Sequence, residues 1–435
     1  MTDMKVVVEK LVAGGYSLAH LPNNKVVLLD GGYPDEFVEI QIDREKKDLA
    51  FGRVTKVLTP SQKRRKPRCK HFGECGGCRW QDIEYLYQLD MKREILREQF
   101  FRIARMDVEV EKVEASPNEF EYRNIAEFTF QARKLGFKRW HSSSVVDIKR
   151  CWICPKTFSD IARRMRESVE MLNLPIYNWK SGEGVLKHLV IRQNSRGDLM
   201  IIIVTKTEHL PNSREITRMM ARYFPAASIV HLMNAKDSIV LRGPYRILKG
   251  EGVITEETDW YTFQIPPTAF FQVNLPVALK MAEYVYEEIH PDKNAVLIDM
   301  YTGVGFLAIN SSHGFKKVLG VDSNRVAIKA AVSNANINRI RNVEFVNQDV
   351  EDFVTNMPEC DRVILDPPRQ GISERILKKI VDRRPKRVLY VACDTASLAR
   401  DVRKFVDAGY RLEKLAIFDM FPQTHHIETV ATLTM

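Results

Sequence analysis

The chain of 435 residues, 45% of them hydrophobic, is too long to be organised around a single core, and we expect two or three domains. Its formal net charge of +10 and its pI near 9.1 favour a polyanionic partner, without separating RNA from DNA or from a membrane surface. No run of about 18 apolar residues is present to span a bilayer, and the N-terminus MTDMKVVVEK lacks the apolar centre of a signal peptide, so we expect a cytoplasmic protein with no membrane partner.

Residues 4–58 are expected to form a small β-barrel. Short β-branched runs separated by Gly-containing turns follow one another at the spacing typical of barrels that bind oligonucleotides. The next ten residues, SQKRRKPRCK at 61–70, include six basic ones. This run is predicted to be either a solvated linker or a contact for phosphates.

Three of the seven cysteines crowd between positions 69 and 78. In a reducing compartment this clustering favours metal binding or catalysis over disulfides. A helix is predicted from Asp82, where apolar residues recur at spacings of three and four. Residues 105 to about 250 then mix strands and helices.

From about residue 290, short apolar strands alternate with helical segments. Strands are predicted at AVLIDM (295–300), KVLGVD (317–322), VEFVNQD, RVILD and RVLYVACD. This alternation predicts a mostly parallel, doubly wound sheet. The last two strands, RLEKLAIFDMFP and HIETVATLTM, have no helix between them. Such a hairpin edge is typical of methyltransferase sheets and differs from the usual dinucleotide-binding layout.

The residues that follow these strands are the candidates for ligand binding, because ligands of such sheets lie at the carboxyl ends of the strands. Gly303 and Gly305 allow a cofactor to approach the backbone closely, and Asp322, 19 residues beyond Gly303, can accept hydrogen bonds from a ribose. This pattern fits NAD as well as S-adenosylmethionine. Asp366, in the stiff turn LDPPRQG, is placed to orient a planar base edge, the alternative being a purely structural Pro-Pro turn.

Cys393 ends the fifth predicted strand. Free cysteines are often small core side chains, but this one precedes a helix that Asp394 could cap, so we expect a lowered thiol pKa and a reactive thiolate. Glu428, in HHIETV, supplies a carboxylate for proton transfer. His425 and His426 have no partner at zinc-like spacing and are expected to face solvent or to form hydrogen bonds.

A thiolate, a carboxylate and a methyl donor in one cleft fit the methylation of uracil carbon 5. Addition of the Cys393 thiolate to carbon 6 turns the ring into an enolate, whose carbon 5 can then accept a methyl group. Glu428 removes the carbon 5 proton, and the thiolate is eliminated.

The ordered motifs FFQVN (270–274), DMYTGVG, LDPPRQG, CDTASLARD and FPQTHHIETV resemble the signature of the RNA uracil-5-methyltransferases. With YRN at 122–124 and the barrel, the resemblance covers essentially the whole chain. It implies an α/β fold with a doubly wound, Rossmann-like methyltransferase domain at 251–435, a TRAM domain (an OB-like β-barrel) at 1–60, and an α+β central domain at 61–250 with a [4Fe-4S] cluster. It also implies S-adenosylmethionine as cofactor and RNA as partner, and we expect a monomer.

Carried over motif by motif, the resemblance makes Cys393 the nucleophile and Glu428 the proton-abstracting base. The residues implied to contact S-adenosylmethionine are Gln272, Tyr301, Asp322, Asp349 and Asp366. The implied cluster ligands are Cys69, Cys75 and Cys78, spaced C-x5-C-x2-C, and Cys151 after the strand VVDIKR. Cys154 is the other candidate for the fourth ligand, and a zinc site is the alternative to the cluster.

The expected RNA is 23S ribosomal RNA, because a TRAM barrel with a cluster is commonest among relatives that act on it. Transfer RNA at the T-loop is the alternative.

Two other classes of function are weighed against this one. Methylation of an exocyclic amine is disfavoured by Arg369, which stands where an aromatic residue is typical after Asp-Pro-Pro. The second competing class is a nonenzymatic RNA-binding protein with a structural metal site.

Overall fold

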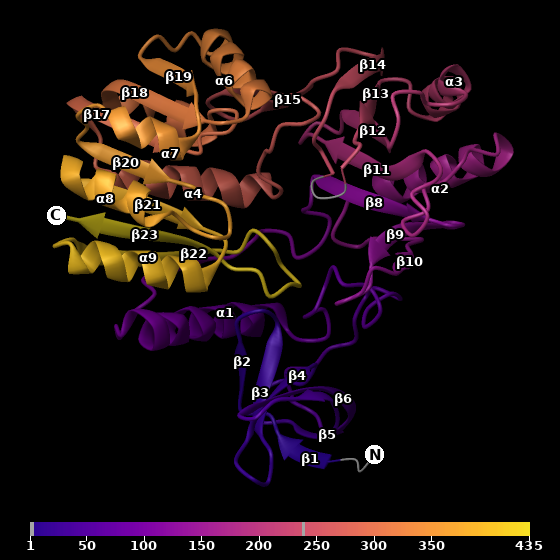
Figure 1. The fold of residues 1–435 in the computed structure, drawn as a ribbon, viewed down its shortest axis with the longest axis horizontal. Helices are drawn as coiled ribbons and strands as arrows, with labels where there is room; N and C mark the ends of the chain where they lie inside the picture. Colours follow the sequence, from indigo (N-terminus) through magenta and orange to yellow (C-terminus); the bar gives the residue numbers. More distant parts are fainter. Residues whose placement is uncertain (1–3, 237–239) are drawn as a thin grey trace.

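The protein is built from three large β-sheets. A computed structural model describes residues 4–236 and 240–435. In Figure 1 the N-terminal sheet lies below the central and C-terminal sheets, which stand side by side. Among the described residues, no helix combines the length and the apolar character needed to cross a membrane.

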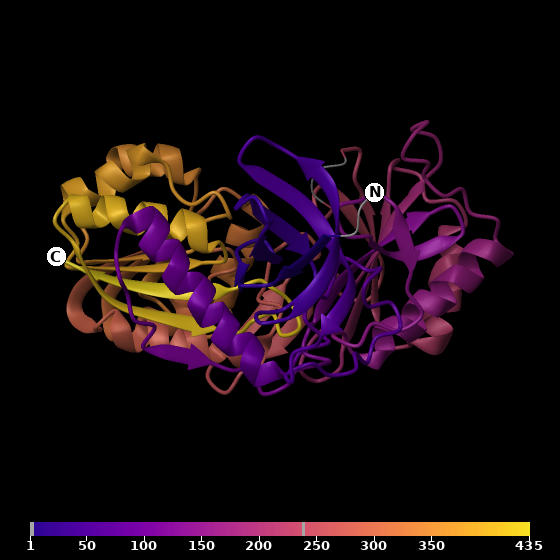
Figure 2. The ribbon, with the colours of Figure 1, turned by 90° about the horizontal axis from the view of Figure 1, so that it is seen from below.

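The N-terminal sheet has six strands in the order β1-β5-β6-β4-β3-β2, and only β4 and β6 pair in parallel. It is strongly curled, which confirms the predicted OB-like barrel (Figure 2). Its interior is apolar, with Val27, Leu29 and Ile40 fully buried. The strands are β1 (Met4–Val7), β2 (Lys10–Val12), β3 (Tyr16–His20), β4 (Val26–Asp30), β5 (Phe37–Glu45) and β6 (Leu49–Thr59).

The central sheet has seven strands in the order β10-β9-β8-β11-β12-β13-β14. Two helices, α2 (Lys156–Met171) and α3 (Ser213–Tyr223), bury apolar side chains against it. The short hairpin β15 (Ile254–Glu257) and β16 (Thr262–Ile265) follows this sheet. The sheet strands are β8 (Ile125–Gln131), β9 (Lys134–Lys138), β10 (Val145–Asp147), β11 (Leu186–Gln193), β12 (Leu199–Thr205), β13 (Ser228–Met233) and β14 (Tyr245–Lys249).

The C-terminal sheet has eight strands in the order β19-β18-β17-β20-β21-β23-β22-β7. The first five pair in parallel, and β23 runs antiparallel to both β21 and β22. Both the doubly wound sheet and its terminal hairpin are therefore confirmed. The strands are β17 (Asp292–Met300), β18 (Phe315–Asp322), β19 (Val343–Asn347), β20 (Arg362–Leu365), β21 (Arg387–Ala392), β22 (Arg411–Phe418), β23 (Glu428–Thr434) and β7 (Lys112–Glu114).

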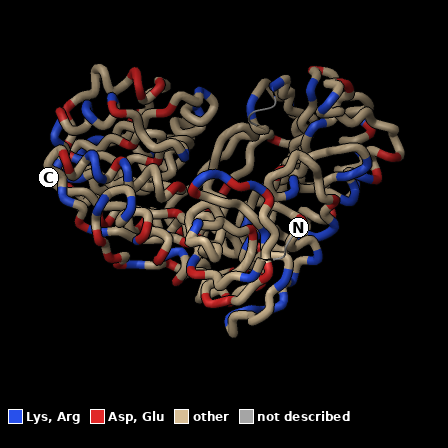
Figure 3. Tube along the Cα trace, turned by 60° about the horizontal axis from the view of Figure 1, so that its bottom comes forward, with Lys and Arg blue, Asp and Glu red and all other residues tan. Residues whose placement is uncertain are grey.

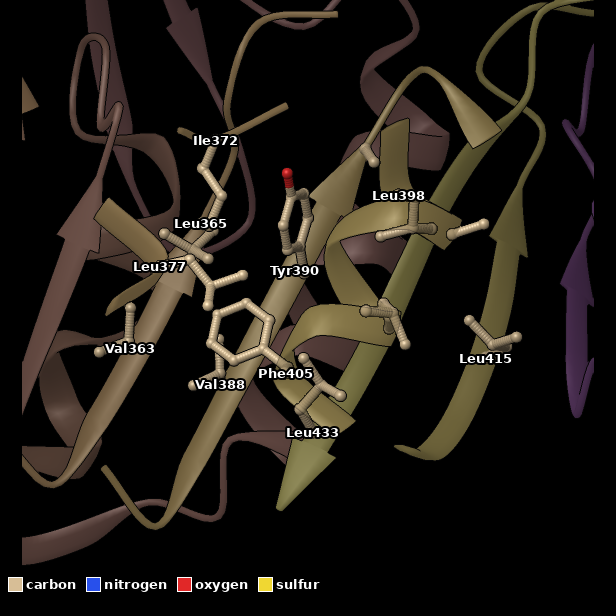
Figure 4. Close-up of a cluster of buried hydrophobic side chains, with 14 of the residues drawn as sticks. Val363, Leu365, Ile372, Leu377, Val388, Tyr390, Leu398, Phe405, Leu415 and Leu433 are labelled. Carbon is tan, nitrogen blue, oxygen red and sulfur yellow. The ribbon is translucent and has the colours of Figure 1, made fainter. Parts of the chain in front are cut away.

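Helices cover both faces of the C-terminal sheet, so its strands are apolar on both sides. One face is covered by α4 (Leu275–Glu288), α5 (Phe306–Ser311) and α6 (Arg325–Ile337). The other face is covered by α1 (Tyr85–Gln99), α7 (Val350–Phe353), α8 (Glu374–Arg383) and α9 (Thr395–Asp407). Figure 4 shows this second layer, where Phe405 of α9 packs against Val388 and Leu433.

Two elements of the C-terminal layer come from far upstream in the sequence. Strand β7 pairs in parallel with β22 and forms the sheet edge, and helix α1 packs across the β22–β23 side (Figure 2). Helix α1 continues into a short π-helix at Phe100–Ala104. The sequence predicted the helix but gave no indication of where it would pack.

Candidate active site

The pairing of β21 with β23 brings Cys393 and Glu428 together. Ala392, the last residue of β21, pairs with Thr429, so Cys393 and Glu428 occupy the next position on each side. Glu428 also pairs with Phe418 of β22. Its side chain is buried, and Cys393 is half-buried. The two residues are 35 positions apart in the chain but share one end of the sheet.

The thiol of Cys393 differs from the expectation of a lowered pKa. Asp394 does cap helix α9, since its carboxylate accepts a hydrogen bond of 2.8 Å from the Ser397 N–H. Nevertheless, the pKa of Cys393 is raised to about 11, mainly by burial and also by the negative charges of Glu428 and Asp366, while Arg369 opposes the shift. The predicted sign was wrong because burial and two carboxylates outweigh the helix N-terminus.

The carboxyl groups beside Cys393 are also shifted. Burial raises the pKa of Glu428 to about 8, and the charge of Asp366 adds to the shift while Arg369 counters it. Burial raises the pKa of Asp366 to about 7, with a further contribution from Asp322. Carboxyl groups with pKa values near neutrality can exchange protons at physiological pH, as general acid–base catalysis requires.

Glu428→Gln is expected to stabilise the folded protein at alkaline pH. Because the pKa of Glu428 is about 8 against an ordinary 4.5, only the folded protein keeps this proton between those pH values. The free energy of unfolding therefore falls as pH rises through this range, by about 3 kcal/mol at pH 7. Urea denaturation should show the variant more stable than the wild type at pH 8 and similar to it at pH 5. An equal difference at both values would contradict the assignment.

The predicted cofactor residues lie near the switch point between β17 and β20, where the strand order reverses. A small cavity here is lined by Gln272, Tyr301 and Asp366, three of the residues predicted to contact a cofactor, and by Gly303. Tyr301 and Gly303 both have positive φ, of 67° and 57°, so the chain turns sharply after β17. The N–H of Gly303 donates 3.0 Å to the carboxylate of Asp322, which ends β18.

Asp322 and Asp349 lie outside the lining of this cavity. Asp349 is exposed and caps α7, accepting 2.9 Å from the Glu351 N–H. Both are close enough to contribute charge at Tyr301, whose pKa is raised mainly by burial and further by Glu351, Asp349 and Asp322. The structure therefore brings all five predicted cofactor residues to one end of the sheet, three of them around the cavity.

The sequence assigned no role in this site to Asp299, and it assigned Arg369 only a role in separating classes of methyltransferase. Asp299 is buried in the cavity lining, where its Oδ2 accepts 2.5 Å from Thr302 Oγ1 while its Oδ1 has no partner. Burial raises the pKa of Asp299 to about 7. Arg369 is the charge that opposes the shifts of Cys393 and Glu428. Asp299 lies in the motif DMYTGVG and Arg369 in LDPPRQG. Their position beside the predicted site residues Tyr301 and Asp366 could have identified them.

The histidines before Glu428 are not solvent-facing groups. His425 and His426 are half-buried, and their rings lie 4.3 Å apart beside Trp140 and Phe421. Burial lowers the pKa of His425 to about 4 and that of His426 to about 3. The Nδ1 of His425 is buried without a hydrogen-bond partner. Both rings therefore act as neutral packing groups.

Part of the basic run at 61–70 is occupied by internal ion pairs. Arg64 binds both carboxylate oxygens of Glu36, at 2.6 and 2.9 Å, and also pairs with Asp82. Arg65 pairs with Glu119 at 2.7 Å. The exposed cations of the run are Lys63, Lys66, Arg68 and Lys70. Lys63 also pairs with Glu84, at 3.3 Å. Along the described residues both signs of charge are interspersed (Figure 3), and the predicted phosphate contact is left mainly to Lys66, Arg68 and Lys70.

The four predicted cluster cysteines face one cavity. Cys69, Cys75, Cys78 and Cys151 line a space of about 450 Å³, together with Cys154. Burial raises the pKa of Cys75 to about 12 and also raises those of Cys69 and Cys78, with the charge of Cys151 adding to each. Within residues 4–236 and 240–435, no group of three or more His, Cys, Asp or Glu side chains is arranged to hold a metal ion.

Comparison with known proteins places this site in a family. Residues 251–435 match the family model described as tRNA (Uracil-5-)-methyltransferase, and residues 2–55 match the TRAM domain model. A Thermotoga maritima protein named "Uncharacterized RNA methyltransferase" is 49% identical over 432 residues, which cover 99% of this chain and 98% of that protein. A Clostridium tetani protein of the same name is 32% identical, covering 95% of this chain and 92% of its own.

A solved structure is similar over the whole chain. The crystal structure of Pyrococcus abyssi tRNA (uracil-54, C5)-methyltransferase in complex with S-adenosyl-L-homocysteine matches with a TM-score of 0.79 and 30% sequence identity, covering 99% of this chain and all of that one. The order of the motifs, the matches to two family models and the whole-chain relatives all indicate the same family. The chain belongs to the family of S-adenosylmethionine-dependent RNA uracil-5-methyltransferases.

Proposed function

We propose that this enzyme methylates carbon 5 of uridine in RNA through a covalent intermediate on Cys393, with Glu428 as the base. The observation that carries the proposal is the register of β21 and β23, which places the thiol and the buried carboxyl at adjoining strand ends. Asp366, at the end of β20, supplies a third ionisable group within electrostatic reach of both.

The reaction uses the two residues in sequence. The Cys393 thiolate forms a bond to uracil carbon 6, and the ring becomes an enolate that is nucleophilic at carbon 5. S-adenosylmethionine supplies the methyl group that carbon 5 attacks. Glu428 then takes the carbon 5 proton, and the returning electrons break the bond between sulfur and carbon 6. Cys393 leaves as the thiolate, and Glu428 holds the proton until solvent removes it.

Arg369 is proposed to favour the reactive forms of both groups. The thiol of Cys393 has a pKa of about 11 and Glu428 one of about 8, so both are mainly protonated in the resting site at neutral pH. The positive charge of Arg369 lowers both values. A positively charged group near these side chains stabilises thiolate and carboxylate together, which addition and proton abstraction each require.

Gln272, Tyr301, Asp322, Asp349 and Asp366 are proposed to hold S-adenosylmethionine. The residues present fit this cofactor in two respects. The positive-φ turn at Tyr301 and Gly303 leaves the backbone open after β17, and nothing lies within 4 Å of where a side chain on Gly303 would begin. The unpartnered Oδ1 of buried Asp299 provides a further acceptor at the same cavity.

The RNA substrate is proposed to be 23S ribosomal RNA, on the combination of a TRAM barrel with a cysteine-lined cavity in the central domain. The whole-chain similarity to a tRNA (uracil-54, C5)-methyltransferase favours transfer RNA as a second candidate. Mapping 5-methyluridine in RNA from cells that lack this protein separates the two. Loss from 23S ribosomal RNA supports the first candidate and loss from transfer RNA the second, whereas no loss from either would contradict uridine methylation.

We also propose the division into domains 1–60, 61–250 and 251–435, in which α1 and β7 of the second segment pack into the C-terminal layer. The protein is proposed to act as a monomer in the cytoplasm. The central domain would hold a [4Fe-4S] cluster through Cys69, Cys75, Cys78 and Cys151. What supports this proposal is that the four thiols line one cavity of about 450 Å³, and that thiolates are the usual ligands of such clusters. Burial of these thiols opposes their ionisation unless a bound cation compensates the charge.

Cys151→Ser is expected to lose the cluster. Removing one of four thiolate ligands should lower the iron content and the visible absorbance of anaerobically purified protein well below wild type. Cys154→Ser tests the neighbouring candidate and should retain most of the iron. Cys360→Ser, a change at a buried thiol elsewhere in the chain, serves as the control. If Cys151→Ser retains its iron and Cys154→Ser loses it, Cys154 is the fourth ligand of the cluster.

A further inference from the structure

We propose that three buried polar residues on one face of helix α1, Tyr85, Gln88 and Lys92, are positioning residues for the loop that ends at Glu428. This loop, residues 419–427, joins β22 to β23. The inference rests on the proposed function, because it assigns these residues to the step that Glu428 performs. Helix α1 lies outside the region that matches the methyltransferase family model, residues 251–435.

The three side chains share one face of α1 because they are spaced at i, i+3 and i+7. All three are buried, Gln88 and Lys92 completely. Polar groups in such a position are costly unless they are hydrogen-bonded. Each of the three meets this requirement with the 419–427 loop, so the polar face of α1 is directed at that loop.

The first attachment lies where the loop leaves β22. Lys92 Nζ donates 2.5 Å to Asp419 Oδ1 and 3.1 Å to the carbonyl of Phe421. Tyr85 Oη donates 2.7 Å to the other carboxylate oxygen of Asp419. The side chains of Lys92 and Asp419 are both fully buried. A buried ion pair of this kind fixes geometry strongly, because separating its partners leaves an uncompensated charge.

The second attachment lies at Gln423, in the middle of the loop. Gln423 has a positive φ of 69° and is completely buried, so its strained backbone depends on its surroundings. Gln88 accepts 2.9 Å from the Gln423 N–H and donates 3.1 Å to its side-chain oxygen. The N–H groups of Arg79 and Trp80 each donate 3.0 Å to the Gln423 carbonyl.

These contacts reach the chemistry through Glu428, five residues beyond Gln423. A small displacement of the loop would move the carboxyl relative to carbon 5, and an error of about 1 Å in a reacting group can lower the rate by about 100-fold. Glu428 is the first residue of β23 and pairs with Phe418, so the loop determines how the chain enters that pairing. Cys393 lies away from this loop, between β21 and the capped helix α9. Loosening the loop should therefore slow proton abstraction more than thiol addition, so that the covalent intermediate accumulates.

Gln88→Met tests this expectation, because methionine keeps a similar volume and removes both bonds to Gln423. It also removes the bonds that the Gln88 amide donates to the carbonyls of Trp80 and Ile83, at 2.9 and 3.1 Å. With RNA tritiated at uridine carbon 5, tritium release measures proton loss and a denaturing gel measures the adduct. We expect kcat to fall by about 10-fold, the KM for S-adenosylmethionine to stay within about twofold, and the adduct fraction during turnover to rise several-fold.

Leu96→Ala on the same helix is the matched control. Leu96 is buried in the apolar core, so its truncation destabilises α1 without removing a hydrogen bond to the loop. It should lower the thermal midpoint while leaving the adduct fraction per active enzyme unchanged. If Gln88→Met only lowers the amount of active enzyme, without accumulating adduct, the positioning role is overturned. If the wild type itself forms no adduct that depends on Cys393, the proposed function fails, and this inference with it.

Discussion

Cys393→Ala is expected to abolish methyl transfer to RNA, lowering kcat/KM by on the order of 10⁴-fold or more. Alanine cannot form the bond to carbon 6, and without that bond carbon 5 is too weak a nucleophile to take the methyl group. The measurement is transfer of tritium from labelled S-adenosylmethionine to substrate RNA. Binding of S-adenosylmethionine, followed by calorimetry, should change little, because Cys393 is absent from the lining of the cofactor cavity.

Cys360→Ala is the matched control for this substitution. Cys360 is a free, buried cysteine whose thiol has a pKa raised to about 12, mainly by burial, and it belongs to the apolar core. Its truncation leaves a small cavity and should cost stability while leaving turnover per folded molecule unchanged. Normal turnover by Cys393→Ala would rule out the covalent mechanism.

Glu428→Gln is expected to trap a covalent complex between protein and RNA. Glutamine cannot accept the carbon 5 proton, so the methylated adduct forms but cannot release the thiolate. We expect multiple turnover to fall by about 10²- to 10⁴-fold, the range for loss of a general base. A band of protein-linked RNA should survive a denaturing gel. The RNA in this band should carry the methyl group only when S-adenosylmethionine is present.

The double variant Cys393→Ala/Glu428→Gln identifies the linkage, because it should show no such band. A band that persists in the double variant would mean that another nucleophile reacts. Rapid turnover by Glu428→Gln without any adduct would instead show that a different group removes the proton. Asp366 would then be the first residue to test, since its pKa of about 7 also suits a base.

The strands of the C-terminal sheet could be predicted because their residues are apolar on both faces and are bounded by Gly, Pro and Asp. The segments predicted from AVLIDM and RVLYVACD correspond to β17 and β21. The position of each candidate after a strand then followed from a general property of parallel sheets. For this reason the amino-acid sequence was enough to single out Cys393, Asp322 and Asp366 as candidates.

The electrostatics of the site could not be predicted in the same way. The expected thiolate depended on local structure, a helix starting behind Cys393, and that helix and its Asp394 cap are present. The pKa of the thiol is nevertheless raised, mainly by burial and also by the charges of Glu428 and Asp366, which come from β23 and from the turn after β20. The burial of a side chain depends on neighbours that are distant in the chain, so a local sequence pattern does not predict it.

The sequence by itself determined the family, the alternation of strands and helices, and the residues at the strand ends, because these depend on local periodicity and on motifs of adjacent residues. Only the tertiary structure decided that Cys393 and Glu428 meet across the β21–β23 pair and that Asp299 is buried at the cofactor cavity. It alone also showed that Gln88 and Lys92, more than 320 residues upstream, hold the loop before Glu428. Hydrogen bonds and burial between distant segments form only when the chain is packed, and they decide how reactive the chosen residues are.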